Sequence, residues 1–155
     1  MHLRRGDMWS EPADVYVVTA NATIRSDGAL VMGRGAALDA WRLYPGCNKV
    51  FGQKLTAHFA RNGLKKEPYG VIIHSGQTKP DLAIFQVKWH YSEMAQLDLI
   101  EHSLTCLNGL ANTVWKHAKI SLNFPGIGNG GLPRIDVYCL IHDLPDNVSI
   151  WELPK

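Results

Sequence analysis

The run over residues 15–19 (VYVVT) constrains the fold more than any other stretch of the chain. Its β-branched and aromatic residues favour a strand, and apolar side chains occur on both faces of that strand. A strand that is apolar on both faces is typical of the centre of a parallel sheet covered by helices on each side. The run therefore predicts a layered α/β fold.

Strand-like and helix-like patterns alternate through most of the chain, which favours a largely parallel sheet with helices on both faces. Strands are predicted over residues 2–5 (an edge strand), 15–19, 29–32, 71–74, 82–87, 120–124 and 148–153. Helices are predicted over three regions: residues 35–44, with Ala37, Trp41 and Tyr44 on one face; residues 50–61, with Val50, Phe51, Leu55 and Phe59 on one face; and residues 135–143. A turn-rich segment, GQTKPD, spans residues 76–81.

The longest helix is expected from about Glu93 to His117. Its apolar residues recur at spacings of three and four, which places them on one stripe that should face the core. The members of this stripe are Leu97, Ile100, Leu104, Leu107, Ala111, Val114 and Ala118.

Two glycine-rich loops each follow a predicted strand and precede a predicted helix. The first ends in Gly33-Arg34-Gly35, and the second, residues 126–131, has four glycines in six residues. Because glycine costs conformational entropy on ordering, such clusters indicate positive φ angles or the close approach of another group. Loops at strand-to-helix junctions can hold an anion on backbone N–H groups. The sequence of each loop is compatible both with a phosphate-binding loop and with a tight surface turn.

Neither loop is a standard nucleotide motif. Residues 28–35 (GALVMGRG) have the glycine spacing of a P-loop, but Arg34-Gly35 stands where a P-loop has Lys-Ser/Thr. The dinucleotide fingerprint fails at Leu38, which occupies the third glycine position. These departures disfavour a kinase, an NTPase and a dinucleotide-dependent enzyme.

Length and composition predict one globular domain over residues 1–155, with 46% hydrophobic and 19% charged residues. The net charge of +2 offers no case for nonspecific binding to nucleic acid or membranes. Cys47, Cys106 and Cys139 lack metal-ligand spacing and are expected to be buried thiols in a reducing compartment. No run is long and apolar enough for a membrane span, and the first residues lack a signal-peptide core, so a cytoplasmic location is expected.

Four stretches, in this order, resemble the motifs of the macro domain, an ADP-ribose-binding module. They are Gly6-Asp7-Met8, Thr19-Ala20-Asn21, residues 31–35 (VMGRG) and residues 125–132 (PGIGNGGL). The resemblance spans nearly the whole chain. It is strongest to the branch that contains the terminal ADP-ribose protein glycohydrolase and the antitoxins paired with DNA ADP-ribosylating toxins, and compact phage-encoded members are also similar. It implies a three-layer α/β/α fold with a mixed, largely parallel sheet and ADP-ribose as ligand, without a cofactor or metal.

The resemblance also implies roles for individual residues. Asp7 would accept a hydrogen bond from the adenine amino group, Met8 would supply a backbone contact, and Asn21 would lie by the distal ribose. The residues that would surround the diphosphate and distal ribose are Met32, Gly33, Arg34, Gly35, Gly126, Ile127, Gly128, Asn129, Gly130 and Gly131. Taken alone, Asp7 is more typical of a turn residue or a helix N-cap than of a ligand-binding residue.

Lys88 follows the predicted strand 82–87 and matches a lysine that the hydrolytic branch uses on C1 of the distal ribose. Such chemistry needs a neutral amine, which requires a lowered pKa. A solvated lysine at a strand end is the alternative. The glycohydrolase has an acidic residue where this chain has Gly130, so Lys88, Asn21 and backbone amides would carry any catalysis. An ester or nucleic-acid linkage would then be a more suitable substrate than a more stable bond.

The expected function is therefore ADP-ribose binding, with removal of ADP-ribose from nucleic acid or protein as the associated activity. The alternatives are a non-catalytic reader or scavenger and a phosphatase acting on ADP-ribose 1''-phosphate. His90 is a candidate acid or base, whereas His58, His102 and His117 are expected at helix surfaces. Trp89 and Tyr91 are expected either to stack on a base or to pack. The host cytoplasm would be the location of a phage-encoded member, and the sequence predicts no oligomeric state.

Overall fold

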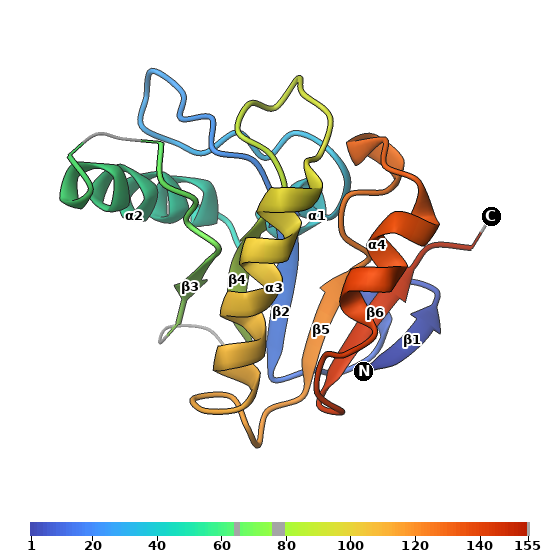
Figure 1. Ribbon diagram of the computed structural model, residues 1–155. Helices are drawn as coiled ribbons and strands as arrows, with labels where there is room; N and C mark the ends of the chain where they lie inside the picture. Colours follow the sequence, from blue (N-terminus) through green and yellow to red (C-terminus); the bar gives the residue numbers. More distant parts are fainter. Residues whose placement is uncertain (64–65, 76–79, 155) are drawn as a thin grey trace.

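The computed structural model describes residues 1–63, 66–75 and 80–154, and shows one six-stranded sheet between two layers of helices (Figure 1). The strand order is β1-β6-β5-β2-β4-β3, and every neighbouring pair is parallel except β3 and β4. The strands are β1 (His2–Arg5), β2 (Val15–Ala20), β3 (Val71–His74), β4 (Asp81–Gln86), β5 (Ile120–Asn123) and β6 (Val148–Glu152). The helices are η1 (Met8–Ser10), α1 (Gly35–Leu43), α2 (Cys47–Arg61), α3 (Leu97–Ala111), η2 (Gly128–Gly130) and α4 (Arg134–Ile141). The predicted mixed, largely parallel sheet is confirmed.

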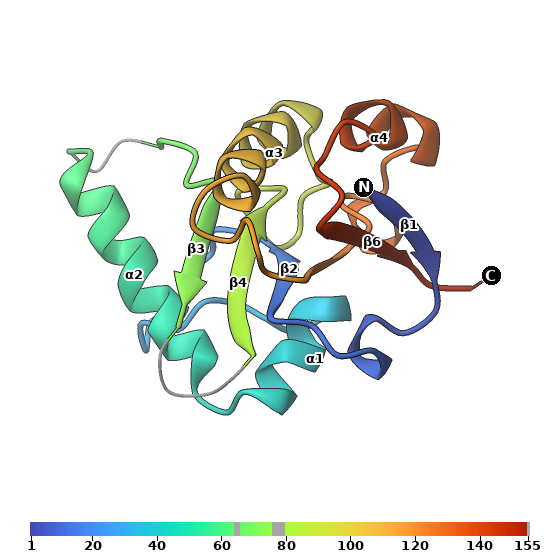
Figure 2. The ribbon, with the colours of Figure 1, turned by 90° about the horizontal axis from the view of Figure 1, so that it is seen from below.

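Strand β2 lies between β5 and β4 and is buried on both faces, as the VYVVT run predicted. Val15 and Val17 join the core under α3 and α4, whereas Tyr16 and Val18 join the core under α1 and α2. Figure 2 shows the two helical layers on opposite faces of the sheet. The alternation of side chains along one strand therefore supplies both cores.

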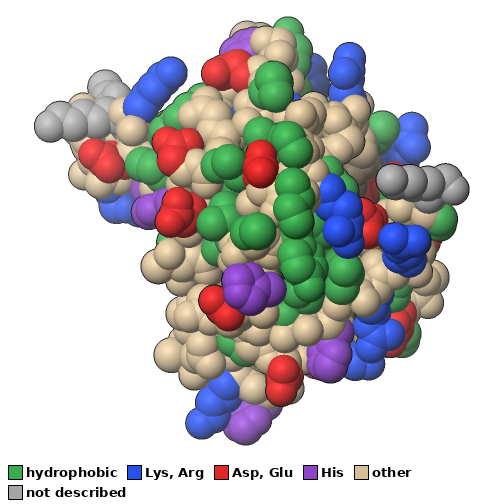
Figure 3. All heavy atoms as spheres, turned by 45° about the vertical axis from the view of Figure 1, so that its right-hand side comes forward, with side chains coloured by type: hydrophobic (Ala, Val, Ile, Leu, Met, Phe, Trp, Pro, Cys, Tyr) green, Lys and Arg blue, Asp and Glu red, His purple; other side chains and the backbone are tan. Residues whose placement is uncertain are grey.

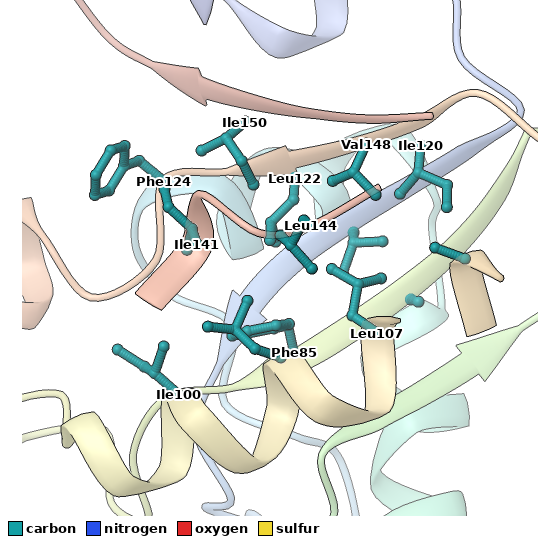
Figure 4. Close-up of a cluster of buried hydrophobic side chains, with 14 of the residues drawn as sticks. Phe85, Ile100, Leu107, Ile120, Leu122, Phe124, Ile141, Leu144, Val148 and Ile150 are labelled. Atoms are coloured by element: carbon teal, nitrogen blue, oxygen red, sulfur yellow. The ribbon is translucent and has the colours of Figure 1, made fainter. Parts of the chain in front are cut away.

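The core beneath α3 and α4 is a continuous apolar layer (Figure 4). Ile100 and Leu107 of α3 and Ile141 of α4 face side chains from the sheet, among them Leu122 and Ile150. All five side chains are fully buried. This packing holds α3 and α4 on the sheet and positions the loops at their ends.

The chain leaves neighbouring strands β2 and β5 in opposite directions. After β2 it continues through α1 and α2 towards β3 and β4, and after β5 it continues through α4 to β6. Such a reversal of strand order leaves an opening between the loops at the carboxyl ends of the two strands. The topology therefore places a crevice where the sequence has its two glycine-rich loops.

Residues 29–32 do not form the predicted strand. The only pairing described there is an isolated bridge between Ile24 and Leu30. The Leu30 N–H donates to Asn48 O and the Val31 N–H to Thr23 O, both at 2.9 Å. The run is apolar because it is buried against α2, so burial by a helix imitated the pattern of a strand.

Helix α1 buries Ala37 of the predicted face, and Tyr44 packs against the same core, but Trp41 does not. Ala37 and Ala40 are buried, whereas Trp41 is 36% exposed. Tyr44 lies at the C-cap, and its hydroxyl donates to Pro80 O. The short helix therefore packs through its alanines, which allow a close approach to the sheet.

Helix α3 is shorter at both ends than expected, spanning Leu97–Ala111. Val114, which was predicted in the core, is 76% exposed, and Trp115 is buried in its place. The reason is a series of turns after the helix: Asn147 Nδ2 donates to the carbonyls of Ala111, Trp115 and Ala118 at 2.9–3.2 Å. A distant asparagine thus satisfies the carbonyls that a longer helix would have used internally.

The outer side of α4 is largely apolar, with Ile135 63% and Tyr138 37% exposed. Figure 3, which brings this side of the molecule forward, shows a band of apolar side chains next to basic ones.

Within the described residues, no helix is long and apolar enough to cross a membrane. The predicted turn at residues 76–81 lies mostly outside the described residues, which resume at Pro80.

Candidate functional site

A cavity of about 870 Å³ opens at the carboxyl ends of the central strands. This volume is within the range of pockets that hold a cofactor-sized ligand. The lining residues come from five segments: 6–9, 19–21, 31–39, 87–93 and 123–130, with 151–153 completing the wall. Every site residue predicted from the sequence lines this cavity except Gly131, which lies just beyond it.

The cavity extends across the sheet. Lys88 follows β4 and Glu152 ends β6, and these strands are separated by β2 and β5. Three strand spacings correspond to roughly 14 Å. The site can therefore hold an extended ligand whose two ends meet different groups.

The two glycine loops approach each other on one wall. A Cβ atom placed on Gly35 would lie 3.4 Å from Asn129 Nδ2. Gly35 has a φ of +58°, and Gly128 has a φ of +65°. Both loops thus present backbone in conformations that favour glycine, and they meet at the start of α1.

The N-terminus of α1 faces the same wall. Arg34 is the N-cap residue in an extended conformation, and among the described residues no side chain caps the helix. The first turn also lacks an acidic residue. The free N–H groups and the positive end of the helix dipole favour an anion at this position.

Glycine is required at different positions of the two loops for different physical reasons. A Cβ on Gly126 would lie 2.6 Å from Ile100 Cδ1, so packing explains that glycine. Gly33 has neither a positive φ nor a heavy atom within 4 Å of its added Cβ among the described residues, yet it lines the cavity. Nothing in the fold of the described chain requires glycine there, whereas a ligand lying close to the backbone would.

Asn21 is buried, and its side chain bridges the loop that leads to the first glycine motif. Its Oδ1 accepts from the Thr23 N–H at 2.9 Å, and its Nδ2 donates to Val31 O at 3.1 Å. The buried Tyr69 hydroxyl donates to the Asn21 carbonyl at 2.7 Å. The fold therefore uses Asn21 as a loop anchor. Its amide has a second N–H besides the one that donates to Val31 O.

Asp7 is the N-cap of η1, the alternative that its sequence context also allowed. Its Oδ1 accepts from the Trp9 N–H at 3.0 Å, which fixes the carboxylate at the cavity wall. Hydrogen bonds within the described chain leave its second oxygen unused. Met8 is buried beside it. Capping and ligand binding can thus be served by the two oxygens of one carboxylate.

Lys88 is half-buried on the opposite side of the cavity. Its pKa is lowered, chiefly because burial disfavours the ammonium form and further because the Arg34 guanidinium is near; Glu93 opposes this effect. A lowered pKa makes a neutral amine more accessible near physiological pH. The direction of this pKa shift is the one that a lysine nucleophile needs.

Thr19 and Asn123, which had no role assigned from the sequence, bridge the ends of β2 and β5 at the crevice. Asn123 Oδ1 accepts from the Thr19 N–H, and Asn123 Nδ2 donates to Thr19 Oγ1, both at 2.9 Å. The β2–β5 ladder ends before this point, at Val17 and Leu122. The amide thus replaces ladder bonds where the strands diverge. Two polar residues at the ends of adjacent apolar strands were the available signal.

Further cavity residues also lacked an assigned role: Trp9, Asp39, Ser92, Glu93, Trp151 and Glu152. Tyr91 lines the cavity and is 54% exposed, whereas Trp89 packs near Phe59 and below Lys66. His90 is exposed and contacts Ser92. Residues 89–93 lie in the irregular segment between β4 and α3, where local patterns do not predict the direction of a side chain, whereas Asp39 is in α1 and Trp151 and Glu152 end β6.

The remaining histidines and cysteines lie outside the cavity lining. His58 and His102 are on helices, but His117 is on a turn after α3. Cys47 is buried, Cys106 partly buried and Cys139 exposed, so the expectation of three buried thiols is wrong for Cys139. No group of His, Cys, Asp and Glu within the described part of the chain could hold a metal ion.

Comparison with known proteins relates this architecture to solved structures. No protein-family model matches the chain, and no curated protein sequence matches it. The macrodomain of Thermus aquaticus DarG is 22% identical with a TM-score of 0.76, and that of Mycobacterium tuberculosis DarG is 23% identical with a TM-score of 0.73. Both matches cover 99% of this chain and 97% of the other.

Thermosipho africanus DarTG, solved in complex with ADP-ribose, is 20% identical with a TM-score of 0.78. That match covers 99% of this chain and 42% of the other. The similarity extends over nearly every described element and agrees with the motifs in the sequence. The chain therefore has the macrodomain fold.

Proposed function

We propose that the protein binds ADP-ribose in this cavity. The observation that carries the proposal is the convergence of two glycine loops and the uncapped start of α1 on one wall. Backbone N–H groups in this arrangement suit a diphosphate. The macrodomain fold supports the choice of ligand, since a protein that shares the fold was solved with ADP-ribose.

The ligand would lie along the cavity with its adenine near Asp7 and Met8. Its diphosphate would lie between Gly33–Gly35 and residues 126–131, and its distal ribose near Asn21 and Lys88. The order follows the order of the strands, from the β1–β6 edge towards β4. An extended ligand with a base at one end and a reactive sugar at the other matches this separation.

We further propose that the protein releases ADP-ribose from a modified nucleic acid or protein. The neutral Lys88 amine would attack C1 of the distal ribose, forming a C–N bond as the bond from C1 to the acceptor breaks. The electron pair of that bond leaves with the acceptor, which takes the proton that the attacking amine loses. One water then attacks C1 and breaks the C–N bond; its hydroxyl stays on the sugar and its proton returns to the Lys88 amine. The lowered pKa of Lys88 supports this assignment.

Gly130 limits the mechanism. It stands where the glycohydrolase branch has an acidic residue, and a Cβ there would lie 3.0 Å from Ala95 Cβ. The Gly130 carbonyl also accepts from the Ala95 N–H at 2.9 Å. The close contact with Ala95 and this backbone hydrogen bond thus leave little room for a side chain at position 130. This favours a labile ester or nucleic-acid linkage as substrate, and it equally favours a reader that binds ADP-ribose without turnover.

Calorimetric titration with ADP-ribose tests the binding proposal. The wild-type protein should bind, and Asp7→Ala should weaken binding because the adenine amino group loses its acceptor. Asp143→Ala is the matched control, since that carboxylate is 88% exposed and outside the cavity lining. No detectable heat at millimolar ADP-ribose would remove the proposal.

Release of ADP-ribose from ADP-ribosylated DNA and ADP-ribosylated protein tests the enzyme proposal. Lys88→Ala should abolish release while ADP-ribose still binds, and Lys116→Ala, which changes an exposed lysine on the turn after α3, should not. Activity that survives in Lys88→Ala would exclude the lysine mechanism. Binding without release from either substrate would identify a reader, and phosphate release from ADP-ribose 1''-phosphate would identify a phosphatase.

The cellular setting is also part of the proposal. The three cysteines are free, which suits a reducing cytoplasm, including that of a host cell if the chain is phage-encoded.

A further inference from the structure

The segment between β4 and α3 carries both Lys88 and a carboxylate of the cavity wall, Glu93. Among the described residues, the carboxylates that line the cavity are Asp7, Asp39, Glu93 and Glu152. Asp7 and Glu152 belong to the β1–β6 side of the sheet, and Asp39 is on α1. Glu93 is therefore the carboxylate that shares a short segment with Lys88.

This segment, the yellow-green loop that leads into α3 in Figure 1, is held at several points. Backbone hydrogen bonds join it to the loop after β2, to the second glycine loop and across its own ends. They are Ala22 N–H to Trp89 O, Ala95 N–H to Gly130 O and Gln96 N–H to Val87 O, at 2.8–2.9 Å. The segment thus has a fixed place between the loops that follow β2 and β5.

The Glu93 side chain is oriented by its own turn. The Glu93 N–H donates to His90 O at 3.1 Å, and Glu93 Oε1 accepts from the His90 N–H at 2.7 Å. Hydrogen bonds and ion pairs within the described chain leave Oε2 unused. Because Glu93 is exposed and lines the cavity, one oxygen fixes the carboxylate and the other is available to a ligand.

His90, the acid or base considered from the sequence, is engaged elsewhere. It is outside the cavity lining. Its Nδ1 accepts from the Ser92 N–H at 3.2 Å and lies 2.7 Å from Ser92 Oγ. On this segment, the group that can exchange a proton inside the cavity is therefore the Glu93 carboxylate.

Glu93 affects the Lys88 amine without an ion pair between the two side chains. Burial lowers the pKa of Lys88 most, the Arg34 guanidinium lowers it further, and Glu93 raises it. The described residues include no direct contact between the Lys88 amine and the Glu93 carboxylate. This arrangement suits a reacting group that lies between them.

We infer that Glu93 is a second catalytic residue, which acts on the water that releases the sugar from Lys88. The inference rests on the proposed release of ADP-ribose. As the water oxygen bonds to C1, Glu93 Oε2 takes one proton of that water, and the hydroxyl stays on C1. The electron pair of the C–N bond moves to the Lys88 nitrogen, which takes the proton from Glu93. The carboxylate and the neutral amine are restored, and one water is consumed.

The substitution Glu93→Gln tests this role with little change of structure. The amide oxygen can still accept from the His90 N–H, so the turn is kept, but the NH₂ group in place of Oε2 takes no proton. ADP-ribosylated DNA and ADP-ribosylated protein are the substrates. Steady-state release of ADP-ribose should fall by about 100-fold, at the lower end of what a general base contributes, while the affinity for free ADP-ribose is kept.

The Glu93→Gln variant should also retain the sugar. The step that frees the acceptor does not use Glu93, so a rapid burst of acceptor should precede the slow release. Intact-mass measurement should then show an ADP-ribosyl group on the chain, and the added substitution Lys88→Ala should remove it. Glu101→Gln is the matched control and should behave as the wild-type protein, because Glu101 is exposed on α3 and outside the cavity lining.

Unchanged release in Glu93→Gln would overturn the inference. Slower release without the covalent adduct would overturn it too, because the carboxylate would then act before the sugar reaches Lys88. A wild-type protein that releases ADP-ribose from neither substrate, or a Lys88→Ala variant that keeps its activity, would instead refute the proposed function on which the inference rests.

Discussion

At the scale of single residues, the candidate site depends on side chains that serve the fold and the ligand at once. Asp7 caps η1 with one oxygen, and Asn21 anchors the loop before the first glycine motif. Asn123 holds the ends of β2 and β5. Substitutions at these positions therefore change stability as well as binding, and a variant needs a folding measurement before its affinity is interpreted.

Lys88 offers a residue-scale prediction for pH dependence. Its pKa is lower in the folded chain than its ordinary value of 10.5, chiefly through burial. Between the two values the unfolded chain binds more protons, so the unfolding free energy should rise with pH across that window. Urea titrations at several pH values should show this rise in the wild-type protein relative to Lys88→Met. A difference between the two proteins that does not change with pH would contradict the assigned environment.

The same residue predicts the pH profile of any hydrolysis. The reactive amine is neutral above its pKa, so the rate at low substrate concentration should rise with pH and level off below 10.5.

At the scale of elements, the packing of α2 on the loop before the first glycine motif controls the shape of the site. A Cβ added to Gly52 of α2 would clash with Gly28 O and would lie 3.0 Å from Ala29 Cα. These atoms belong to backbone and cannot rotate away. The loop that reaches Met32 and Gly33 is therefore supported by a helix glycine that is distant from the cavity.

Gly52→Ala should consequently destabilise the protein by about 3 kcal/mol, at the upper end of overpacking costs, and should weaken ligand binding. Gly109→Ala is the matched control, because Gly109 is an exposed helix residue whose added Cβ meets no heavy atom among the described residues. That change should stabilise the protein by about 0.5–1 kcal/mol. Urea denaturation measures both, and equal effects would refute the packing argument.

At the scale of the whole molecule, the cavity joins segments that are far apart in the sequence. Its walls come from the carboxyl ends of β1, β2, β4, β5 and β6 and the chain that follows them, so one bound ligand would connect segments from five of the six strands. Binding to the folded state alone stabilises it by mass action. At a concentration of 100 times the dissociation constant, this amounts to about 2.7 kcal/mol.

Thermal denaturation in the presence of ADP-ribose should therefore show a melting temperature raised by about 5–10 °C at that concentration. Asp7→Ala should show a smaller rise at the same ligand concentration, whereas Asp143→Ala should match the wild-type protein. An equal rise in Asp7→Ala and in the wild-type protein would contradict the role of Asp7 in binding.

Local patterns were sufficient for most of the sheet and for the position of the two glycine loops. Period-2 patterning and apolar faces depend on near neighbours in the chain, so the buried strand β2 and the largely parallel order could be predicted. Residues 29–32 and Val114 could not, because a helix and Asn147 from distant segments decide their environment. Apolar character predicts burial better than it predicts which element achieves it.

The same distinction between local patterns and distant contacts applies to the residues of the site. The motifs around Asp7, Asn21, Gly33–Gly35 and residues 126–131 could be recognised in the sequence because each is a short contiguous stretch. The tertiary structure alone brought Glu93 and Arg34 to Lys88 and placed Glu152, whose carboxylate binds Arg134, in the wall of the same cavity. Electrostatic environment and hydrogen-bond satisfaction depend on distances in space, and neither is encoded by the spacing of residues along the chain.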